Sequence, residues 1–442
     1  MGSGSVSRTH RGGAPGGAVD AVSFWQKHAD EAASHPPLRD REDTEFAIVG
    51  AGIAGLSLAL QLAEAGREVV VVEESVPGAG ALGASAGIVA PQLVRTTPQR
   101  VLASLGRDVG GGWLRLIGES GGHLFGLIRE HGIECDARPH GFVAPARGVD
   151  ALRRLTAVVE EWRPFRRDLT VLDTAGVAAL TGTVGYTAAV LDASGGGIDP
   201  VRLAHGLADR LVAAGGRLFH QSPATALTRE QDAWRLTTAG GSVRAAQVTL
   251  CANGGNHRLH PLLRETVLPM RIHELVTRPL SAAMRAAVLP QGQALTDLEH
   301  DIFSIRWIAG ARMLTYYPVA AHTTAAAVEA AVNKRLRDML RYHEPVEIAH
   351  LWQGVAWMNS SLLPRVVRLD ERLLAVQACN GRGIATNAIV GREVARMLLA
   401  PMSYHPQIAL DVPRRVRGFA LARHLPTVLL HGARAMARWS RR

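Results

Sequence analysis

The sequence predicts an α/β fold in two parts: a Rossmann-like domain and a mostly antiparallel β domain formed by insertions into it. Residues 45–74 form the pattern of a strand, a glycine turn, a helix and a second strand. Residues 190–265 and 346–412 again combine strands, glycine turns and helices. Residues 134–189 and 266–345 show alternating patterns rich in Val, Thr, Ile, Tyr and Trp, which are typical of antiparallel strands.

The domain boundaries follow from these patterns. We expect a flexible, Gly/Ser-rich N-terminus over residues 1–20, a short amphipathic helix over 21–33 and a basic amphipathic tail over 413–442. The first domain is predicted to be discontinuous, and the second to lie between its pieces. The ranges are 21–133, 190–265 and 346–412 for the first domain, and 134–189 and 266–345 for the second.

Composition and cysteine spacing indicate a globular protein from a reducing compartment, and we expect the cytoplasm. The 442 residues are 47% hydrophobic and 20% charged, which allows a sizeable core. Cys135, Cys251 and Cys379 are widely spaced and form no CxxC pair, so we expect neither a disulfide framework nor a metal site. Residues 46–63 approach membrane-spanning length, but their three glycines suit a nucleotide-binding fold better. The N-terminus lacks a signal-peptide pattern.

The net charge of +10 is concentrated at the C-terminus, where residues 413–442 carry eight arginines and no acid. The rest of the chain is nearly neutral, which argues against a nucleic-acid partner. Two interpretations of the tail remain open: a helix that packs on the body with its arginines in water, or a helix that contacts an anionic surface.

Residues 47–74 have the features of a dinucleotide site. Gly50 permits a tight turn, Gly52 lets the backbone approach a pyrophosphate, and Gly55 allows close packing of helix on strand. The helix N-terminus faces the anion. Glu73 follows the second strand, where a carboxylate can accept hydrogen bonds from ribose hydroxyls, and its charge disfavours a 2′-phosphate.

Two further glycine-rich elements distinguish FAD from NAD. Residues 80–92, GALGASAGIVAPQ, follow the acid directly, and the turn in QACNGRGIATN precedes a helix near the C-terminus. Together with LWQGVAWMNSSLLPRV, these motifs resemble the D-amino-acid oxidase superfamily of FAD-dependent oxidoreductases, especially its glycine oxidase, sarcosine oxidase and gamma-glutamylputrescine oxidoreductase branches. The resemblance covers most of residues 20–400 and implies a glutathione-reductase-like FAD-binding domain with a substrate, or cap, domain.

The resemblance also implies which residues contact FAD. The GASAGIVAP segment would line the pyrophosphate and flavin, the strand near Pro223 would contact adenine, and LCANGG would end a strand over the cofactor. The resulting set is Gly50, Gly52, Ile53, Ala54, Gly55, Glu73, Glu74, Ala84, Ser85, Ala86, Gly87, Ala224, Ala252, Asn253, Gly254, Gly381, Arg382, Gly383, Ile384 and Ala385. The helix N-terminus after Gly381 also suits the negative charge that flavin reduction builds at the pyrimidine end.

Three departures from the family are informative. No cysteine lies between Trp352 and Pro364, where some sarcosine-oxidase relatives attach flavin, so we expect noncovalent FAD and a merely packed Cys379. Lys27 and Lys334 are the only lysines, so a lysine that activates oxygen above the flavin is doubtful, and the electron acceptor is either oxygen or a quinone or carrier. MNSS replaces the common MTPD, so the substrate of this protein cannot be inferred from the substrates of amino-acid dehydrogenases.

The substrate site is predicted on the second domain. Arg306 is a candidate carboxylate clamp, and Trp307, Tyr316 and Tyr317 are candidate wall residues, unless all four only pack. His273 lies beside Glu274 on the first long strand of this domain and is either catalytic or structural.

These observations predict a FAD-dependent oxidoreductase that oxidises the C–N bond of a small amine or amino acid by hydride transfer to flavin, with later hydrolysis of the imine. Two alternatives remain: a flavoprotein that acts on a modified tRNA base, and a FAD-binding protein without turnover.

Overall fold

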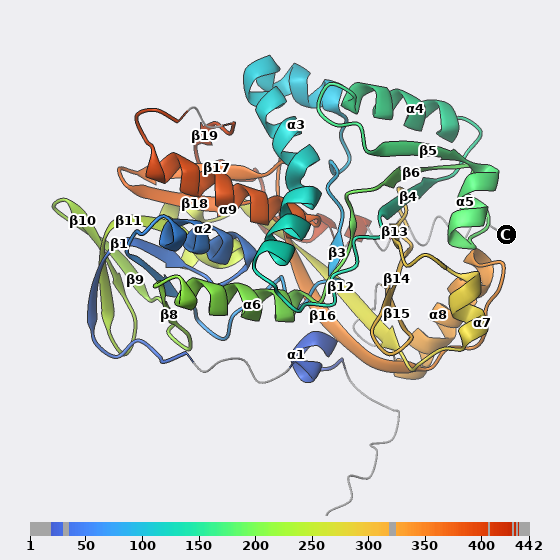
Figure 1. Ribbon diagram of the computed structural model, residues 1–442, viewed down its shortest axis with the longest axis horizontal. Coiled ribbons are helices and arrows are strands. Elements are labelled where there is room, and N and C mark those ends of the chain that lie inside the picture. The colour runs from blue at the N-terminus through green and yellow to red at the C-terminus, as the bar shows by residue number, and fades with distance from the viewer. Residues whose placement is uncertain are drawn as a thin grey trace, which may run out of the picture.

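The computed structural model describes residues 19–29, 35–317, 324–404, 407–426, 428, 429 and 432. In this part of the chain, two large sheets lie beside each other, one of nine strands and one of eight. Figure 1 shows the first sheet on the left with α2, α6 and α9, and the second on the right with α4, α5, α7 and α8.

The predicted strand–helix–strand unit is confirmed as β1 (Arg41–Val49), α2 (Ile53–Glu64) and β2 (Val69–Val72). Strand β1 pairs in parallel with β2 on one side and with β11 (Ser242–Leu250) on the other. Strand β11 in turn pairs in parallel with β18 (Leu373–Gln377). The carboxyl ends of these four strands therefore meet at one edge of the first sheet, which is where open α/β sheets bind ligands.

The first sheet has the order β19-β17-β18-β11-β1-β2-β8, with β10 and β9 added beside β11. Its other strands are β8 (Arg217–Phe219), β9 (Ala226–Glu230), β10 (Ala233–Thr237), β17 (Arg365–Asp370) and β19 (Leu410–Asp411). The helices of this part are α3 (Pro98–Glu130), α6 (Pro200–Ala213) and α9 (Gly383–Leu399). The two-stranded ribbon β3 (Ile88–Val89) and β7 (Gly196–Gly197) lies apart from both sheets.

Helix α2 is buried almost throughout and packs against both α6 and α9. A Cβ at Gly391 of α9 would lie only 2.7 Å from the carbonyl oxygen of Ala54, so the two backbones approach closely. This packing holds the N-termini of α2 and α9 in fixed positions near the carboxyl edge of the first sheet.

The second sheet is antiparallel, as predicted, except for the parallel pair β13 and β4. Its order is β16-β12-β15-β14-β13-β4-β6-β5. The strands are β4 (Phe142–Ala146), β5 (Leu169–Asp173), β6 (Ala188–Asp192), β12 (Val267–Thr277), β13 (Ala294–Thr296), β14 (Ser304–Ile308), β15 (Arg312–Tyr316) and β16 (Ile348–Asn359). The helices are α4 (Ala151–Trp162), α5 (Thr174–Thr181), α7 (Ala282–Ala287) and α8 (Ala325–Met339).

Strand β16 corrects the predicted domain boundary at residue 346. It pairs with β12 from Val267↔Asn359 to Val276↔His350, so it belongs to the second sheet. Alternating residues along a strand do not indicate which sheet it joins, because that depends on partners distant in sequence. Strand β6 likewise crosses the expected boundary at residue 190.

The terminal predictions are covered only in part. Helix α1 (Phe24–His28) is shorter than the expected 21–33 helix, and Ser23 and Gln26 form its capping box. Residues 1–18 of the flexible N-terminus expected over 1–20 lie outside the described residues. Much of the basic tail does too, and in its described part the structure has α10 (Phe419–Ala422).

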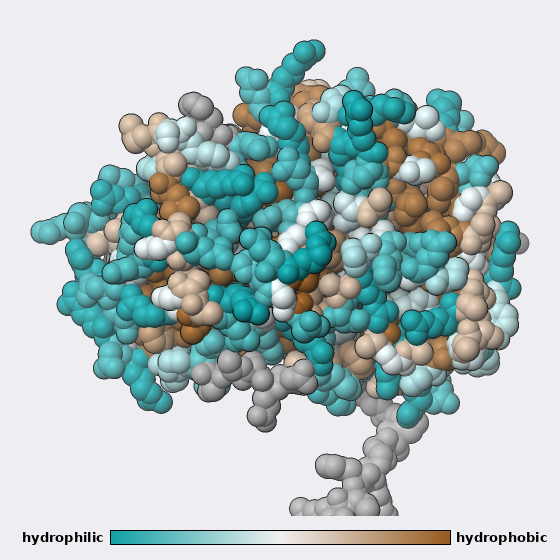
Figure 2. Space-filling model, in the orientation of Figure 1, coloured by the Kyte–Doolittle hydropathy of each residue, from teal (hydrophilic) through white to brown (hydrophobic). Residues whose placement is uncertain are grey.

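The surface view and the helix lengths add two points. Figure 2 shows a mainly hydrophilic face, with hydrophobic residues gathered toward α4 and β5. Among the residues that the structure describes, none of the helices combines the length and apolar character that a membrane span requires.

Candidate cofactor and substrate site

One cavity of about 670 Å³ extends from the carboxyl edge of the first sheet onto the face of the second. This volume is in the range of small-molecule sites. At one end the cavity is lined by Glu73 and Ala224, and at the other by Thr296 and Ser304. The two sheets therefore contribute opposite ends of a single site.

The three glycines of the first turn have different roles. Gly50 has φ +105° and its N–H donates to the carbonyl of Val72 at 2.9 Å. A Cβ at Gly55 would lie 2.0 Å from the carbonyl oxygen of Gly50, so Gly55 is required for packing. A Cβ at Gly52, which begins α2, would meet no atom within 4 Å. Gly52 therefore leaves open space at the helix N-terminus, where a pyrophosphate can approach.

The Glu73 carboxylate is held at the cavity wall by two backbone N–H groups. Ala51 donates to it at 2.7 Å and Ser75 at 3.0 Å. Burial raises the pKa of Glu73, and the hydrogen bonds from Ser75 and Ala51 act in the opposite direction. Glu74 instead points outward and pairs with Arg258 at 3.1 Å at the same end of the cavity. Glu73 thus has the fixed geometry expected of a ribose acceptor.

The 84–87 segment is attached to the second sheet and to α1 by side chains that donate to its carbonyls. The donors are Trp352 to Ala84 at 3.0 Å, Trp25 to Ser85 at 2.8 Å and Arg306 to Ala86 at 2.7 Å. Ala84, Ser85 and Ala86 line the cavity. This predicted cofactor segment is therefore positioned by residues from α1, β14 and β16.

Arg306 is not placed to clamp a substrate carboxylate, and this corrects the prediction. Its side chain is 2% exposed and donates to the backbone carbonyls of Ala86 and Ile198, each at 2.7 Å. The guanidinium lies 5.1 Å from the ring centre of Trp25, and burial lowers the pKa of Arg306 to about 10. Arg306 lies behind the cavity wall and positions the 84–87 segment. Gly87 is required there, since its Cβ would lie 2.6 Å from Arg306 Nη2.

Three other predicted substrate residues do not reach the cavity. Trp307 and Tyr317 belong to a hydrophobic core of the second domain, and the Trp307 indole donates to Val288. Met270, Ile272 and Glu274 line the cavity from β12, so the intervening His273 points to the other face of the strand. The residue of this pair that faces the cavity is Glu274, the neighbour of the predicted His273.

The predicted cofactor residues divide into cavity-lining and packing residues. Those that line the cavity are Gly50, Gly52, Ile53, Ala54, Glu73, Glu74, Ala84, Ser85, Ala86, Ala224, Ala252, Asn253, Gly381, Arg382, Gly383 and Ile384. Gly55, Gly87, Gly254 and Ala385 lie behind them. A Cβ at Gly254 would lie 2.1 Å from the indole of Trp357, which itself lines the cavity. Gly254 therefore supports the wall through Trp357.

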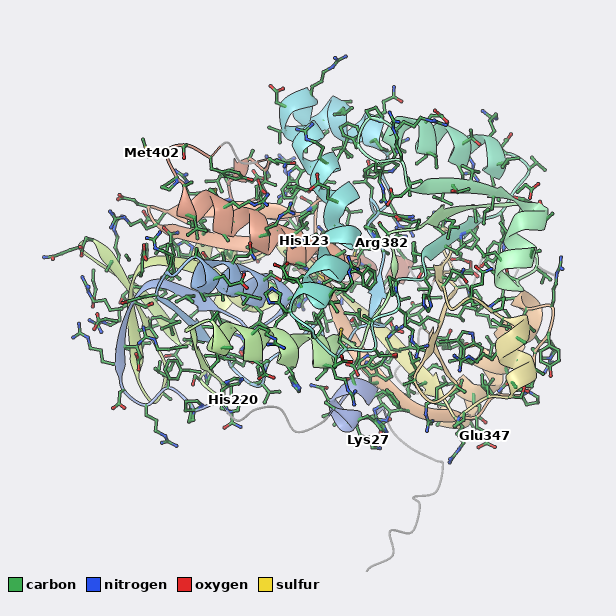
Figure 3. All side chains as sticks on the ribbon, viewed as in Figure 1. Lys27, His123, His220, Glu347, Arg382 and Met402 are labelled. Carbon is green, nitrogen blue, oxygen red and sulfur yellow. The ribbon has the colours of Figure 1, made fainter. Side chains whose placement is uncertain are left out.

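Arg382 lies where the two sheets meet. Its Nη1 donates to Gln92 at 3.1 Å, and its guanidinium lies 5.6 Å from the ring centre of Phe142 on β4. Burial lowers its pKa to about 10. Figure 3 shows Arg382 between the two sheets, near α3, whereas Lys27 lies at the outer end of α1. The N-terminus of α9 and the guanidinium of Arg382 are thus near the middle of the cavity.

A row of polar side chains crosses the second sheet and faces the cavity. Glu274 on β12 is directly opposite Tyr316 on β15, and Ser304 on β14 is opposite Thr296 on β13. The hydroxyl oxygens of Thr296 and Ser304 are 2.9 Å apart, and all four residues line the cavity. Tyr316 was predicted here, whereas Ser304 and Thr296 carry no motif that could have indicated them.

Glu274 is a buried acid at this end of the cavity. Its side chain is 5% exposed, and Oε2 has no hydrogen-bond partner among the described residues. Burial raises the pKa of Glu274 to about 8, with a smaller opposite effect from Arg306. The signal in the sequence was the alternation of β12, in which Met270 and Ile272 are apolar and the next residue on that face is an acid.

The cavity wall fits FAD. Gly52 leaves room at the N-terminus of α2, Glu73 presents a fixed carboxylate, and Asn253 Oδ1 is buried on the wall without a partner among the described residues. These groups match a pyrophosphate, a ribose and a further hydrogen-bond donor in a chain of the length of a dinucleotide. No cluster of metal ligands occurs in the described residues.

Comparison with known proteins supports the same cofactor. The DAO family model, FAD dependent oxidoreductase, matches residues 45–397. Gamma-glutamylputrescine oxidoreductase of Escherichia coli (strain K12) is 29% identical over 383 residues, which cover 85% of this chain and 88% of the relative. The tRNA 5-methylaminomethyl-2-thiouridine biosynthesis bifunctional protein MnmC of Polaromonas sp. (strain JS666 / ATCC BAA-500) is 27% identical over 265 residues, 59% of this chain and 38% of the relative.

Solved structures share the fold. Glycine oxidase from Geobacillus kaustophilus superposes with a TM-score of 0.70 at 20% identity and covers 85% of this chain and 100% of its own. L-proline dehydrogenase from P.horikoshii superposes with a TM-score of 0.67 at 15% identity, and the match covers 82% of this chain and 94% of the neighbour.

Proposed function

This chain belongs to the DAO family of FAD-dependent oxidoreductases, and we propose that it oxidises the C–N bond of a small amine or amino acid. The observation that carries the proposal is the single cavity that joins the dinucleotide wall to the polar row of the second sheet. FAD, when bound, supplies the hydride acceptor. The described residues supply binding, orientation and the exclusion of water.

On the cofactor side, each wall element has a proposed role in a glutathione-reductase-like arrangement. Glu73 accepts hydrogen bonds from the ribose, and the N-terminus of α2 at Gly52 faces the pyrophosphate. The N-terminus of α9, after Gly381, stabilises negative charge at the pyrimidine end. The 84–86 segment lies along the flavin and is kept rigid by its three side-chain donors.

On the substrate side, the second sheet forms a mostly apolar lid with few polar groups. Met270, Ile272 and Trp357 exclude water from the cavity, and Tyr316 and Ser304 offer hydroxyl groups for orientation. Amine oxidation requires a neutral amine and a C–H bond aimed at the hydride acceptor, so positioning contributes most of the rate. The imine product then reacts with water to give a carbonyl compound and a free amine or ammonia.

We propose that FAD is bound noncovalently. The absence of cysteine from residues 353–363 supports this, although Cys251 and Cys379 both line the cavity. Burial raises the pKa of Cys251 to about 12, which keeps that thiol neutral. Acid denaturation should release all of the yellow colour into the supernatant, and flavin retained by the chain would contradict the proposal. The cysteine spacing also supports the cytoplasm as the proposed location.

An anaerobic screen tests the proposed reaction. Purified holoenzyme is mixed with a panel of primary amines, N-methyl amines and amino acids. The flavin absorbance near 450 nm is then followed for a period on the order of hours. At least one class of compound should bleach the flavin. Failure of the whole panel, with a chemical reductant still able to bleach the same sample, would overturn the proposal.

A flavoprotein acting on a modified tRNA base is the second candidate, supported by the similarity to MnmC. This candidate requires binding to tRNA, and an affinity that falls steeply with salt concentration would favour it. A negligible affinity for tRNA even at low salt concentration would exclude this second candidate. A role without turnover is not retained, because the chain belongs to a family of enzymes.

A further inference from the structure

The strongest unexplained feature of the cavity is the carboxyl group of Glu274. From these surroundings we infer that Glu274 binds the positive charge of the substrate, and that the substrate is an alkylamine or diamine rather than an α-amino acid. This inference rests on the proposed function, because it names the substrate class of the same site.

The position of Glu274 is set by the pleat of β12. Met270, Ile272 and Glu274 follow one another on the cavity face, and the two apolar neighbours contribute no hydrogen bond. Across the strands, Glu274 is opposite Tyr316 on one side and Trp352 on the other. The Trp352 indole is already bonded to Ala84. Oε2 of Glu274 is thus buried, and none of the described residues donates a hydrogen bond to it. A bound ligand could supply the missing donor.

The nearby cations are directed elsewhere. Arg306 contributes an electrostatic effect at Glu274, but its Nε and Nη2 donate to the carbonyls of Ala86 and Ile198, and Nη1 has no hydrogen-bond partner among the described residues. Arg382 lines the cavity, its guanidinium lies beside Phe142 on β4, and its Nη1 donates to Gln92. Arg306 therefore offsets one carboxylate from behind the wall. A second carboxylate next to Glu274 would lack a cation of its own, because the cavity-lining arginines of the described chain, Arg258 and Arg382, already pair with Glu74 and Gln92.

Charge then selects the substrate class. In a cavity that excludes water, a bound ammonium group lowers the pKa of Glu274, which burial raises to about 8, and the resulting carboxylate accepts a charge-assisted hydrogen bond. Transfer of one ammonium proton to Glu274 then leaves the neutral amine that oxidation requires. An α-amino acid carries its carboxylate on the carbon that bears the ammonium, so it would bring a second negative charge to the same place. An amine without that carboxylate avoids the repulsion.

A matched pair of ligands tests the inference. Butylamine and norvaline differ only in the carboxylate on the carbon that bears the nitrogen. Their dissociation constants for the anaerobic holoenzyme are measured from the change in flavin absorbance on mixing, and by thermal stabilisation of the protein as a second readout. The variants are Glu274→Gln, which keeps the shape and removes the charge, and His273→Gln, which alters the neighbouring residue on the opposite face of the strand.

We expect butylamine to bind more tightly than norvaline to the unmodified enzyme. Glu274→Gln should raise the dissociation constant of butylamine at least about tenfold and should not raise that of norvaline, because only the amine loses a desolvated partner. His273→Gln should leave both constants unchanged. Tighter binding of norvaline, or butylamine binding that does not depend on Glu274, would overturn this inference and leave the proposed function standing. If no amine or amino acid perturbs, bleaches or stabilises the holoenzyme, the proposed function fails with it.

Discussion

Arg306 Nε donates to the carbonyl oxygen of Ala86 at 2.7 Å and joins the second sheet to the 84–87 segment, which lines the cavity. The same guanidinium donates to Ile198, so one buried charge ties β14 to two loops. A residue whose type and position in the sequence indicate substrate recognition is therefore a positioning residue for the cofactor site.

Arg306→Lys should lower stability and flavin retention. Lysine has a single terminal nitrogen, so one of the two carbonyls loses its donor, at a cost of about 1–3 kcal/mol. Thermal unfolding and flavin content after dialysis measure both effects. The ratio of the butylamine and norvaline dissociation constants should not change. Arg278→Lys, at an exposed ion pair with Glu347, is the matched control and should behave like the unmodified protein. A selective loss of norvaline binding in Arg306→Lys would restore the role of a carboxylate clamp.

Gly55→Ala and Gly52→Ala should fail in different ways. A methyl group at Gly55 meets the carbonyl of Gly50 at 2.0 Å, so little folded protein is expected. A methyl group at Gly52 has open space in the protein but would occupy the approach of the pyrophosphate. Gly52→Ala should therefore keep its circular dichroism spectrum and lose flavin. Equal flavin content in Gly52→Ala and the unmodified protein would show that the pyrophosphate does not bind at this turn.

Glu73→Ala should weaken FAD binding by about 1–3 kcal/mol, because the ribose hydroxyls and the N–H groups of Ala51 and Ser75 lose their acceptor. Equilibrium dialysis of the apoprotein with FAD gives the constant. Glu74→Ala removes only an exposed pair with Arg258 and should change it little. Equal effects of the two substitutions would argue against a ribose contact by Glu73.

Glu274→Gln should stabilise the protein at alkaline pH and not at acidic pH. The pKa of Glu274 rises from about 4.5 to about 8 in the folded state. Between these values the folded state holds a proton that the unfolded state has lost, so stability falls as pH rises. The penalty is absent well below pH 4.5 and complete well above about pH 8, where it reaches roughly 5 kcal/mol.

The measurement is the difference in unfolding midpoint between Glu274→Gln and the unmodified holoenzyme at about pH 5 and about pH 8. The difference should be small at the lower pH and several degrees at the higher one. A difference that does not depend on pH would show that Glu274 ionises normally. Flavin content is measured in both samples, so that a change in cofactor occupancy is not mistaken for the effect of the carboxyl group.

Reoxidation by air should be slow compared with reoxidation by an artificial quinone. Neither lysine is near the cavity: Lys27 is on α1, and Lys334 pairs with Asp338 on the exposed side of α8. A lysine beside the flavin would stabilise the anion that forms from oxygen, and the cavity-lining Arg382 is already engaged with Gln92, so this step should be slow. Stopped-flow mixing of the dithionite-bleached enzyme with either acceptor compares the rates. Air reoxidation as fast as turnover would identify an oxidase.

The sequence by itself determined the cofactor half of this protein. The turn at Gly50–Gly55, the acid at Glu73 and the turn at Gly381–Gly383 are local patterns, because each must place backbone N–H groups or a carboxylate within a few residues of a strand end. Parallel pairing then brings the strand ends to one edge. Local spacing is sufficient for such a site, and the predicted residues line the cavity with few exceptions.

The tertiary structure alone decided the substrate half. A side chain on a strand points to one of the two faces of the sheet, and a long side chain such as that of Arg306 can reach either neighbouring loop. The residue type therefore does not indicate which group the side chain contacts. Pairing of β12 with β15 and β16 turned Glu274 toward the cavity and His273 away from it. Arg306 lies behind the wall because its Nε and Nη2 donate to the carbonyls of Ala86 and Ile198, which are distant in sequence and need donors where they are buried.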